Sequence, residues 1–226
     1  MTYNNTIREW MPYNHDKKKY GKETERIFSG FGEVKPTLLL HACCAPCSSY
    51  TLEALTPHFR KIDIWFYNPN ITPAAEYELR LAELKRLVDT VQYACPVRVA
   101  DAPYDPAAFF AMAKGMEDLP EGGERCYRCY EQRLCSTAEA AKAGGYDWFT
   151  TTLSISPYKN AHWLNSIGVR LGEQYGVPYL ISDFRKNGGY ARSIALSAQY
   201  GLYRQNWCGC VYSRQNSIAE KTLEKL

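Results

Sequence analysis

Short apolar segments alternate with longer amphipathic segments along this chain, and this alternation limits the possible folds more than any other feature. Five apolar segments have the length and composition of buried parallel strands: 37–42, 62–67, 97–100, 148–153 and 177–182. The segments expected to form helices are 48–59, 74–91, one that begins at Asp105–Pro106, and 125–144. Strands separated by helices predict an α/β fold, a parallel sheet covered by helices on both faces. Ligands of such sheets bind at the carboxyl ends of the strands.

The length and composition favour one domain. The 226 residues, 46% of them hydrophobic, suffice for one sizeable core and are short for two. We expect a catalytic domain over 35–213, a helical extension over 1–34 packed on it, and a polar helical tail over 214–226. The segment 1–19 has no apolar run of the length of a signal peptide or membrane span, which predicts a cytoplasmic protein with no membrane partner. A net charge of +3 permits a polyanionic partner without requiring one.

Nine cysteines in a cytoplasmic chain indicate metal or redox chemistry rather than a disulfide framework, because the cytosol keeps ordinary thiols reduced. Cys43, Cys44 and Cys47 follow the first expected strand, where three thiols at a strand-to-helix turn can converge on one metal centre. The helix that follows would stabilise thiolates at its amino end. Small buried core residues are the alternative interpretation for any single cysteine, but a cluster of three makes it unconvincing.

Two further cysteine pairs lie later in the chain. Cys126 and Cys129 form a C-x-x-C motif near the start of a helix, which suits zinc, an iron–sulfur cluster or a redox dithiol. Together with Cys43 and Cys44 they make a four-thiolate set, and the count alone fits tetrahedral zinc and a four-iron cluster equally well. The sequence Trp207-Cys208-Gly209-Cys210 contains a C-x-C pair that can bind metal or close a strained, easily reduced disulfide.

We favour the electron-shuttling disulfide for Cys208 and Cys210, because four thiolates already suffice for one cluster. Cys95 and Cys135 have no partner nearby in sequence and are expected to be buried core thiols. His41 directly precedes the cysteine cluster and can orient or protonate a ligand, although a strand-end histidine bonded to backbone is the commoner case.

Polar and aromatic residues also lie in or after expected loops. Aromatic side chains stack on unpaired bases and cationic side chains meet phosphates, so this set is compatible with nucleic-acid binding, although such charges are often only solvated. Its members are Asn160, His162, Asp183, Arg185, Lys186, Tyr203, Arg204 and Gln205.

Seven ordered motifs make the chain resemble a known family, the epoxyqueuosine reductases of the QueH type, over about residues 35–213. The motifs are Leu38-Leu39-Leu40-His41-x-Cys43-Cys44-Ala45-Pro46-Cys47, Phe66-Tyr67-Asn68-Pro69-Asn70-Ile71, Glu76-Tyr77, Arg125-Cys126-x-x-Cys129-Tyr130-x-x-Arg133-Leu134, Thr151-Thr152-Leu153 with Ser156-Pro157-Tyr158-Lys159-Asn160, Asp183-Phe184-Arg185-Lys186, and Tyr203-Arg204-Gln205-x-x-Cys208-Gly209-Cys210-x-Tyr212-Ser213.

The resemblance implies a sheet related to the adenine nucleotide alpha-hydrolase-like (HUP) folds. It implies an oxidoreductase, independent of cobalamin, that reduces epoxyqueuosine to queuosine at the wobble position of tRNA, the last step of queuosine biosynthesis. It also implies a 4Fe–4S cluster on Cys43, Cys44, Cys126 and Cys129, with a redox-active pair at Cys208 and Cys210. Cys47 stands where a ligand of a second iron would lie.

The expected reaction needs two electrons and two protons, for which Asp183, His41 or a tyrosine hydroxyl are candidate proton donors. Two other functions fit parts of the sequence. A sulfur-transferring tRNA modification enzyme of the same fold would activate its base with ATP, but this chain has thiols where ATP-using relatives of the fold carry a Ser-Gly-Gly-x-Asp-Ser loop. A non-catalytic zinc-binding RNA module would use the cysteines only to hold loops together. The electron donor and the oligomeric state stay open.

Overall fold

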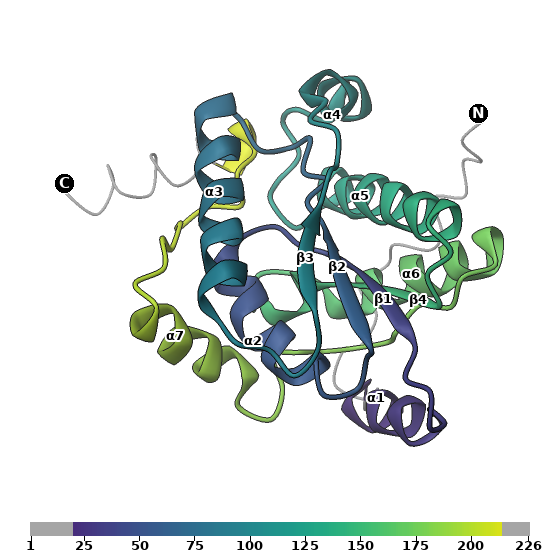
Figure 1. Cartoon of the computed structure of the whole chain (residues 1–226). Helices are drawn as coiled ribbons and strands as arrows, with labels where there is room; N and C mark the ends of the chain where they lie inside the picture. Colours follow the sequence, from purple (N-terminus) through teal and green to yellow (C-terminus); the bar gives the residue numbers. More distant parts are fainter. Residues whose placement is uncertain (1–19, 214–226) are drawn as a thin grey trace.

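Four parallel strands form the centre of the structure, a computed structural model that describes residues 20–213 (Figure 1). The strands are β1 (Thr37–His41), β2 (Lys61–Trp65), β3 (Val97–Ala100) and β4 (Trp148–Thr151), in the spatial order β3-β2-β1-β4. The predicted α/β class with a parallel sheet is confirmed.

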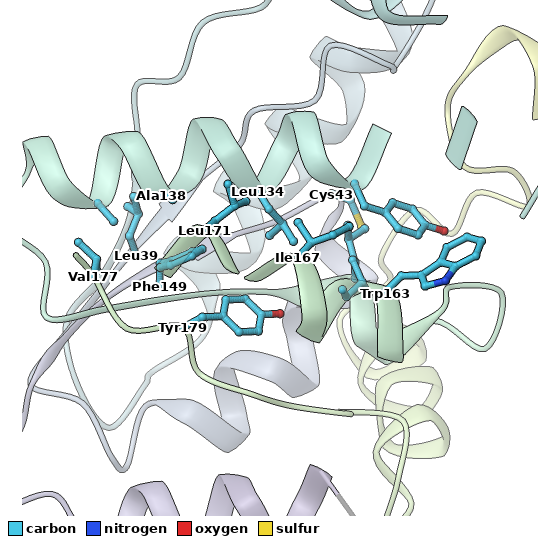
Figure 2. Close-up of a cluster of buried hydrophobic side chains, with 14 of the residues drawn as sticks. Leu39, Cys43, Leu134, Ala138, Phe149, Trp163, Ile167, Leu171, Val177 and Tyr179 are labelled. Carbon is cyan, nitrogen blue, oxygen red and sulfur yellow. The ribbon is translucent and has the colours of Figure 1, made fainter. Parts of the chain in front are cut away.

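Helices cover both faces of this sheet, as predicted. They are α1 (Tyr20–Ser29), α2 (Ala45–Leu55), α3 (Ala74–Thr90), α4 (Pro106–Ala113), α5 (Glu124–Ala143), α6 (Ala161–Tyr175) and α7 (Gly189–Gln199), with a 3₁₀ turn η1 (Thr152–Ile155) after β4. Alternate residues of β1 face opposite sides. Leu39 packs with Leu134 of α5 and Leu171 of α6 (Figure 2), whereas Leu38 and Leu40 belong to a second core cluster with residues of α2 and α3.

The position of β1 determines where the site lies. The chain adds β2 and β3 on one side of β1 and then returns to place β4 on the other side. Open α/β sheets bind ligands where the strand order reverses in this way, outside the carboxyl ends of the strands. The loop of Ala42, Cys43 and Cys44 follows β1 at that point, and η1 follows β4 beside it.

The segment 177–182 is not the fifth strand that its composition predicted. Only one bridge, between Phe149 and Tyr179, joins it to the sheet. Side chains occupy the backbone groups that a ladder would use: Thr150 Oγ1 donates to Leu180 O at 2.9 Å, and Asn165 bonds both the N–H and the carbonyl of Ser182 at 2.9 Å. Two backbone hydrogen bonds form the bridge, from Phe149 N to Pro178 O and from Leu180 N to Phe149 O, and side-chain hydrogen bonds take the place of further strand pairing.

The boundaries of α2 and the existence of α6 and α7 also differ from the sequence prediction. Helix α2 begins at Ala45 instead of Ser48, because Pro46 fits the first turn of a helix and Cys44 is the N-cap residue. No helix was predicted over 161–175, which contains Gly168 and Gly172, residues that disfavour helices. A Cβ at Gly168 would lie 2.5 Å from the ring of Tyr179, so close packing against the 177–182 segment requires glycine there.

Helix α1 and the residues that follow it pack on the core through aromatic side chains, among them Phe28 in the helix and Phe31 after it. Phe31 contacts Phe59 and Trp148 with ring centroids 5.4 and 5.6 Å apart, and Thr24 Oγ1 donates to Ile181 O at 2.7 Å. The division into an extension, a catalytic domain and a tail stays a prediction, and the tail over 214–226 lies outside the described residues. Within residues 20–213, none of the helices has the combination of length and apolar character that crossing a bilayer requires.

Candidate metal and redox site

Three cysteine sulfurs converge just beyond β1. The Sγ atoms of Cys43, Cys44 and Cys47 all lie within 4.8 Å of one another. Cys43 and Cys44 lie in the loop after β1, and Cys47 lies in the first turn of α2, whose unbonded N–H groups create positive potential at this end. Cys43 Sγ is also 3.9 Å from Thr152 Oγ1, which follows β4. The cluster predicted from sequence is therefore present at the carboxyl ends of β1 and β4.

The spacing of these sulfurs suits metal binding. Metal–sulfur bonds of about 2.3 Å in a tetrahedral site separate the sulfurs by about 3.8 Å, and the Cys43 and Cys44 sulfurs lie 3.7 Å apart. Hydrogen bonds from Cys44 and Cys47 hold the pKa of the Cys43 thiol well below its ordinary value. The hydrogen bond between Cys43 and Cys44 raises the pKa of the Cys44 thiol to about 12. One thiolate is thus already stabilised, and a cation would favour the deprotonation of the other two thiols.

A buried arginine lies beside the thiols. Arg133 is 3% exposed, and its Nη2 donates to Asn68 Oδ1 at 2.6 Å. Its charge lowers the pKa of Cys43 and is itself favoured by Cys129 and Cys43, which outweigh the cost of burial and raise the pKa of Arg133. The guanidinium therefore serves as a counter-ion for anionic sulfur.

The same arginine determines the state of His41. Burial and the nearby Arg133 charge lower the pKa of His41 to about 3, so the imidazole is neutral at ordinary pH. His41 Nε2 lies 3.3 Å from Arg133 Nε and 3.2 Å from the carbonyl oxygen of Tyr67, and Nδ1 lies 2.8 Å from Thr151 Oγ1, so both ring nitrogens have hydrogen-bonding partners. His41 is fully buried, so a role in orientation fits the structure better than proton donation.

The C-x-x-C pair lies in the first two turns of α5, where Cys126 and Cys129 are both 8% exposed. Cys126 belongs to the same core cluster as Cys43 and Cys44, whereas Cys129 packs in a neighbouring cluster with Cys210. Burial raises the pKa of both, that of Cys129 to about 11. Within the described residues, the group with mutual spacing under 4.8 Å includes Cys47 but neither Cys126 nor Cys129.

The C-x-C pair lies close to α5. Cys208 Sγ and Cys210 Sγ share a hydrogen bond at 3.4 Å, and both are free thiols, so the disulfide expected for this pair is not present. The hydrogen bond with Cys210 and the ammonium of Lys159 hold the pKa of Cys208 well below its ordinary value despite burial. Cys208 is therefore favoured as a thiolate.

A cavity of about 650 Å³, here called the thiol cavity, joins these groups. Its lining includes four of the thiols and four cationic side chains: Cys43, Cys44, Cys47, Cys208, Arg80, Arg133, Lys159 and Arg204. The volume lies in the range of small-molecule sites. Positive charge on its wall would attract an anionic ligand.

Three of these cations, Arg80, Arg133 and Lys159, were not identified as functional from sequence alone. Arg133 could have been found, because it lies four residues after Cys129 and seven after Cys126 and therefore on the same face of a helix. Lys159 gave no such signal. Its side chain is 11% exposed and lies 3.7 Å from Glu121. Burial lowers its pKa, but Tyr130, Cys208 and Glu121 outweigh this effect and raise it overall.

The remaining predicted polar residues separate into two places. Arg204 and Gln205 line the thiol cavity, whereas Asn160, Asp183, Arg185 and Lys186 line a second cavity. Asn160 ends the loop before α6 and caps the helix by accepting from Trp163 N at 3.1 Å, and His162 follows in the first turn. Cys95 and Cys135 are half-buried and line neither cavity.

A parallel sheet with a cluster of buried thiols at its switch point defines an α/β protein of the metal-binding or redox-active class. Comparison with known proteins makes this specific. The family model described as epoxyqueuosine reductase QueH matches residues 38–216, and the chain belongs to this family. It is 43% identical to the epoxyqueuosine reductase QueH of Staphylococcus aureus (strain Mu50 / ATCC 700699) over 218 residues, which cover 93% of this chain and 90% of that protein.

Other relatives carry the same name. The epoxyqueuosine reductase QueH of Staphylococcus epidermidis is 43% identical over 206 residues, 88% of this chain and 86% of that protein. That of Streptococcus pyogenes serotype M1 is 42% identical over 182 residues, 80% of this chain and 71% of that protein. The resemblance inferred from the seven motifs is thereby confirmed, and neither the sulfur-transferring enzyme nor the zinc-binding module is favoured.

Proposed function

We propose that this protein reduces epoxyqueuosine to queuosine at the wobble position of tRNA. The observation that carries the proposal is the gathering of Cys43, Cys44, Cys47 and Cys208 around one cavity at the switch point of the sheet. The names of its relatives supply the substrate, and the thiols supply a reducing, metal-binding chemistry that suits removal of an epoxide oxygen.

We further propose that Cys43, Cys44, Cys126 and Cys129 hold a 4Fe–4S cluster and that Cys47 binds an additional iron. The donor set fits, because soft thiolates select iron–sulfur clusters and Arg133 offsets part of their charge. The four cysteines come from the loop after β1 and the first two turns of α5, and three of them share one core cluster. When bound, the cluster supplies single-electron transfer, and the additional iron polarises the epoxide oxygen.

Cys208 and Cys210 are proposed to supply reducing equivalents. Oxidation of this dithiol to a disulfide breaks two S–H bonds, forms one S–S bond and releases two electrons and two protons. Conversion of the epoxide to an alkene breaks two C–O bonds and consumes two electrons and two protons, with the oxygen leaving as water. The two half-reactions balance. The low pKa of Cys208 favours the thiolate that begins such an exchange.

The cationic wall of the cavity is proposed to act on the developing negative charge. The ammonium of Lys159 faces Cys208 and lines the same cavity, so it can stabilise an oxygen anion as the C–O bond breaks. Asp183 lines the second cavity and is bound to Arg185 at 2.8 and 2.9 Å. Lys159 is therefore a better candidate than Asp183 or His41 for assisting the oxygen to leave.

The test is anaerobic incubation of iron-reconstituted protein with tRNA that contains epoxyqueuosine and a reductant, followed by nucleoside mass spectrometry. The wild type should form queuosine, the product that has lost one oxygen atom. Cys208→Ser should keep iron and lose most turnover, whereas Cys135→Ser should match the wild type because Cys135 lies outside both cavities. Absence of queuosine with protein that carries iron and sulfide would refute the proposal.

A further inference from the structure

A second cavity lies directly beside the thiol cavity and has no assigned role. It has a volume of about 790 Å³ and is bordered by the start of α1 and by residues 157–161 and 183–187. We call it the α1 cavity. Pro157, Tyr158 and Lys159 line both cavities, so these three residues form the boundary between them. A ligand long enough to extend past this boundary would occupy both spaces.

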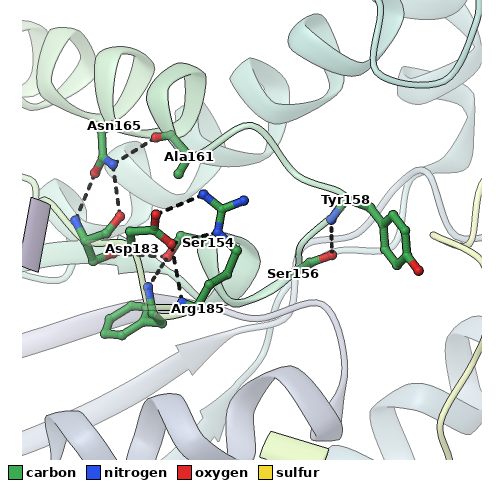
Figure 3. Close-up of polar contacts among 9 residues, drawn as sticks. Ser154, Ser156, Tyr158, Ala161, Asn165, Asp183 and Arg185 are labelled. Atoms are coloured by element: carbon green, nitrogen blue, oxygen red, sulfur yellow. Dashed lines mark hydrogen bonds and ion pairs between the residues drawn. The ribbon is translucent and has the colours of Figure 1, made fainter. Parts of the chain in front are cut away.

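The lining of the α1 cavity indicates a polar, anionic ligand. Lys22 and Lys186 are exposed on it, and neither forms an ion pair with any residue from 20 to 213. Arg185 is different, because Asp183 neutralises it through two hydrogen bonds (Figure 3). With Glu25 and Lys159 included, four cationic and two acidic side chains line the cavity. The two unpaired lysines can therefore accept phosphate without breaking an existing ion pair.

Tyr158 adds an aromatic surface at the boundary. Its side chain is 80% exposed, more than any other aromatic side chain of residues 20–213. Figure 3 shows it extending away from the Asp183–Arg185 pair, and its backbone N–H is bonded to Ser156 Oγ at 3.3 Å. An exposed ring on a restrained loop is the arrangement on which unstacked bases pack in single-stranded RNA recognition.

We propose that the α1 cavity binds the sugar–phosphate backbone of the anticodon loop next to the modified nucleotide, while Tyr158 stacks on a neighbouring base. This inference rests on the proposed function, because it assumes that the modified base enters the thiol cavity. The ligand is then single-stranded RNA held by Lys22 and Lys186 on phosphate and by Tyr158 on a base. The volume is within the range of sites for small ligands and can accommodate one polar nucleotide.

The test measures binding of a labelled anticodon stem-loop RNA to the full chain by fluorescence anisotropy at several salt concentrations under anaerobic conditions. The test variant is Lys22→Ser/Lys186→Ser. The matched control is Lys85→Ser/Lys142→Ser, which removes the same charge from exposed lysines with no ion pair in the described part of the chain. Lys142 is 16 residues beyond Cys126 on α5, about 24 Å along the helix.

The test variant should weaken binding about tenfold and reduce the slope of log K against log salt by about one to one and a half, as expected for two lost phosphate contacts on single strands. The control variant should bind like the wild type. Tyr158→Ala should weaken binding by about fivefold or more, and Tyr158→Phe should restore it, because stacking requires the ring and not the hydroxyl.

Equal affinity and equal salt slope for the test and control variants would overturn the inference, as would a wild type that does not bind the stem-loop. Queuosine formation by the same variants separates this outcome from failure of the proposed function. Normal turnover by Lys22→Ser/Lys186→Ser at low tRNA concentration would overturn the α1 cavity alone, whereas a wild type that forms no queuosine would overturn the proposed function.

Discussion

Replacing Gly209, the residue between Cys208 and Cys210, tests whether backbone geometry positions the dithiol. Gly209 has φ +108°, a conformation that side chains with a Cβ rarely adopt. A Cβ there would lie 2.8 Å from Ile71 Cγ1 and 3.1 Å from Arg80 Nη1. Ile71 is fully buried and cannot move freely. The Gly209 carbonyl also accepts a hydrogen bond from Thr72 N at 2.9 Å, so Gly209 is held both by packing at its Cα and by this hydrogen bond.

We expect Gly209→Ala to destabilise the protein by about 2–5 kcal/mol. Of this, about 1–2 kcal/mol comes from the strained backbone and about 1–3 kcal/mol from overpacking against Ile71. A chain of this size changes its Tm by about 2–4 °C per kcal/mol, so thermal unfolding followed by circular dichroism should show a fall of at least about 4 °C. Turnover should fall as well, because Cys208 and Cys210 would shift.

Gly115→Ala is the matched control, because Gly115 has φ +80° but no atom within 4 Å of the added Cβ. This variant should lose only the strain component, about 1–2 kcal/mol. A Gly209→Ala protein as stable as Gly115→Ala would refute the argument that Ile71 and Arg80 confine the loop.

Three further predictions concern the buried groups around the thiols. Because the folded pKa of His41 lies at about 3, below its unfolded value near 6.5, its contribution to stability is complete above pH 6.5 and is lost as pH falls toward 3. The unfolding free energy should therefore decrease by up to about 1.4 kcal/mol per pH unit over this range, and denaturant titrations of His41→Gln should show a smaller slope. Arg133→Met should raise the pKa of Cys43 in the metal-free protein, which would move the pH dependence of its alkylation rate upward, whereas an unchanged profile would exclude Arg133 as the counter-ion. Cys47→Ser should lose part of the iron while keeping the visible absorption of the cluster, and loss of all iron would make Cys47 a cluster ligand.

The sequence predicted the parts of the fold that depend on local patterns. The apolar runs of β1 to β4 and the amphipathic pattern of α3 and α5 are local, and each was recognised. The prediction of a strand over 177–182 was wrong because the side chains of Asn165 and Thr150, which are distant in sequence, bond to its backbone. Helix α6 was missed because its glycines serve packing against Tyr179, which no local pattern reveals.

The candidate site shows the same division. The cysteine motifs identified the thiols, since clustered cysteines carry their chemistry in their spacing. The neighbourhood of those thiols depends on tertiary structure: Lys159 approaches Cys208 only because the loop after β4 and the C-x-C loop meet at one cavity. The distribution of the polar residues over two cavities likewise follows from the return of the chain through α6 and could not be predicted from loop composition.

The most direct test of the account is iron K-edge X-ray absorption on anaerobically purified protein, combined with iron and sulfide analysis. We predict iron with mainly sulfur neighbours and a short iron–iron distance, both lost in Cys43→Ser and Cys126→Ser and kept in Cys135→Ser. Iron bound only by oxygen and nitrogen, or an unchanged spectrum in Cys43→Ser and Cys126→Ser, would contradict the claim that thiolates from the loop after β1 and from α5 hold one inorganic centre.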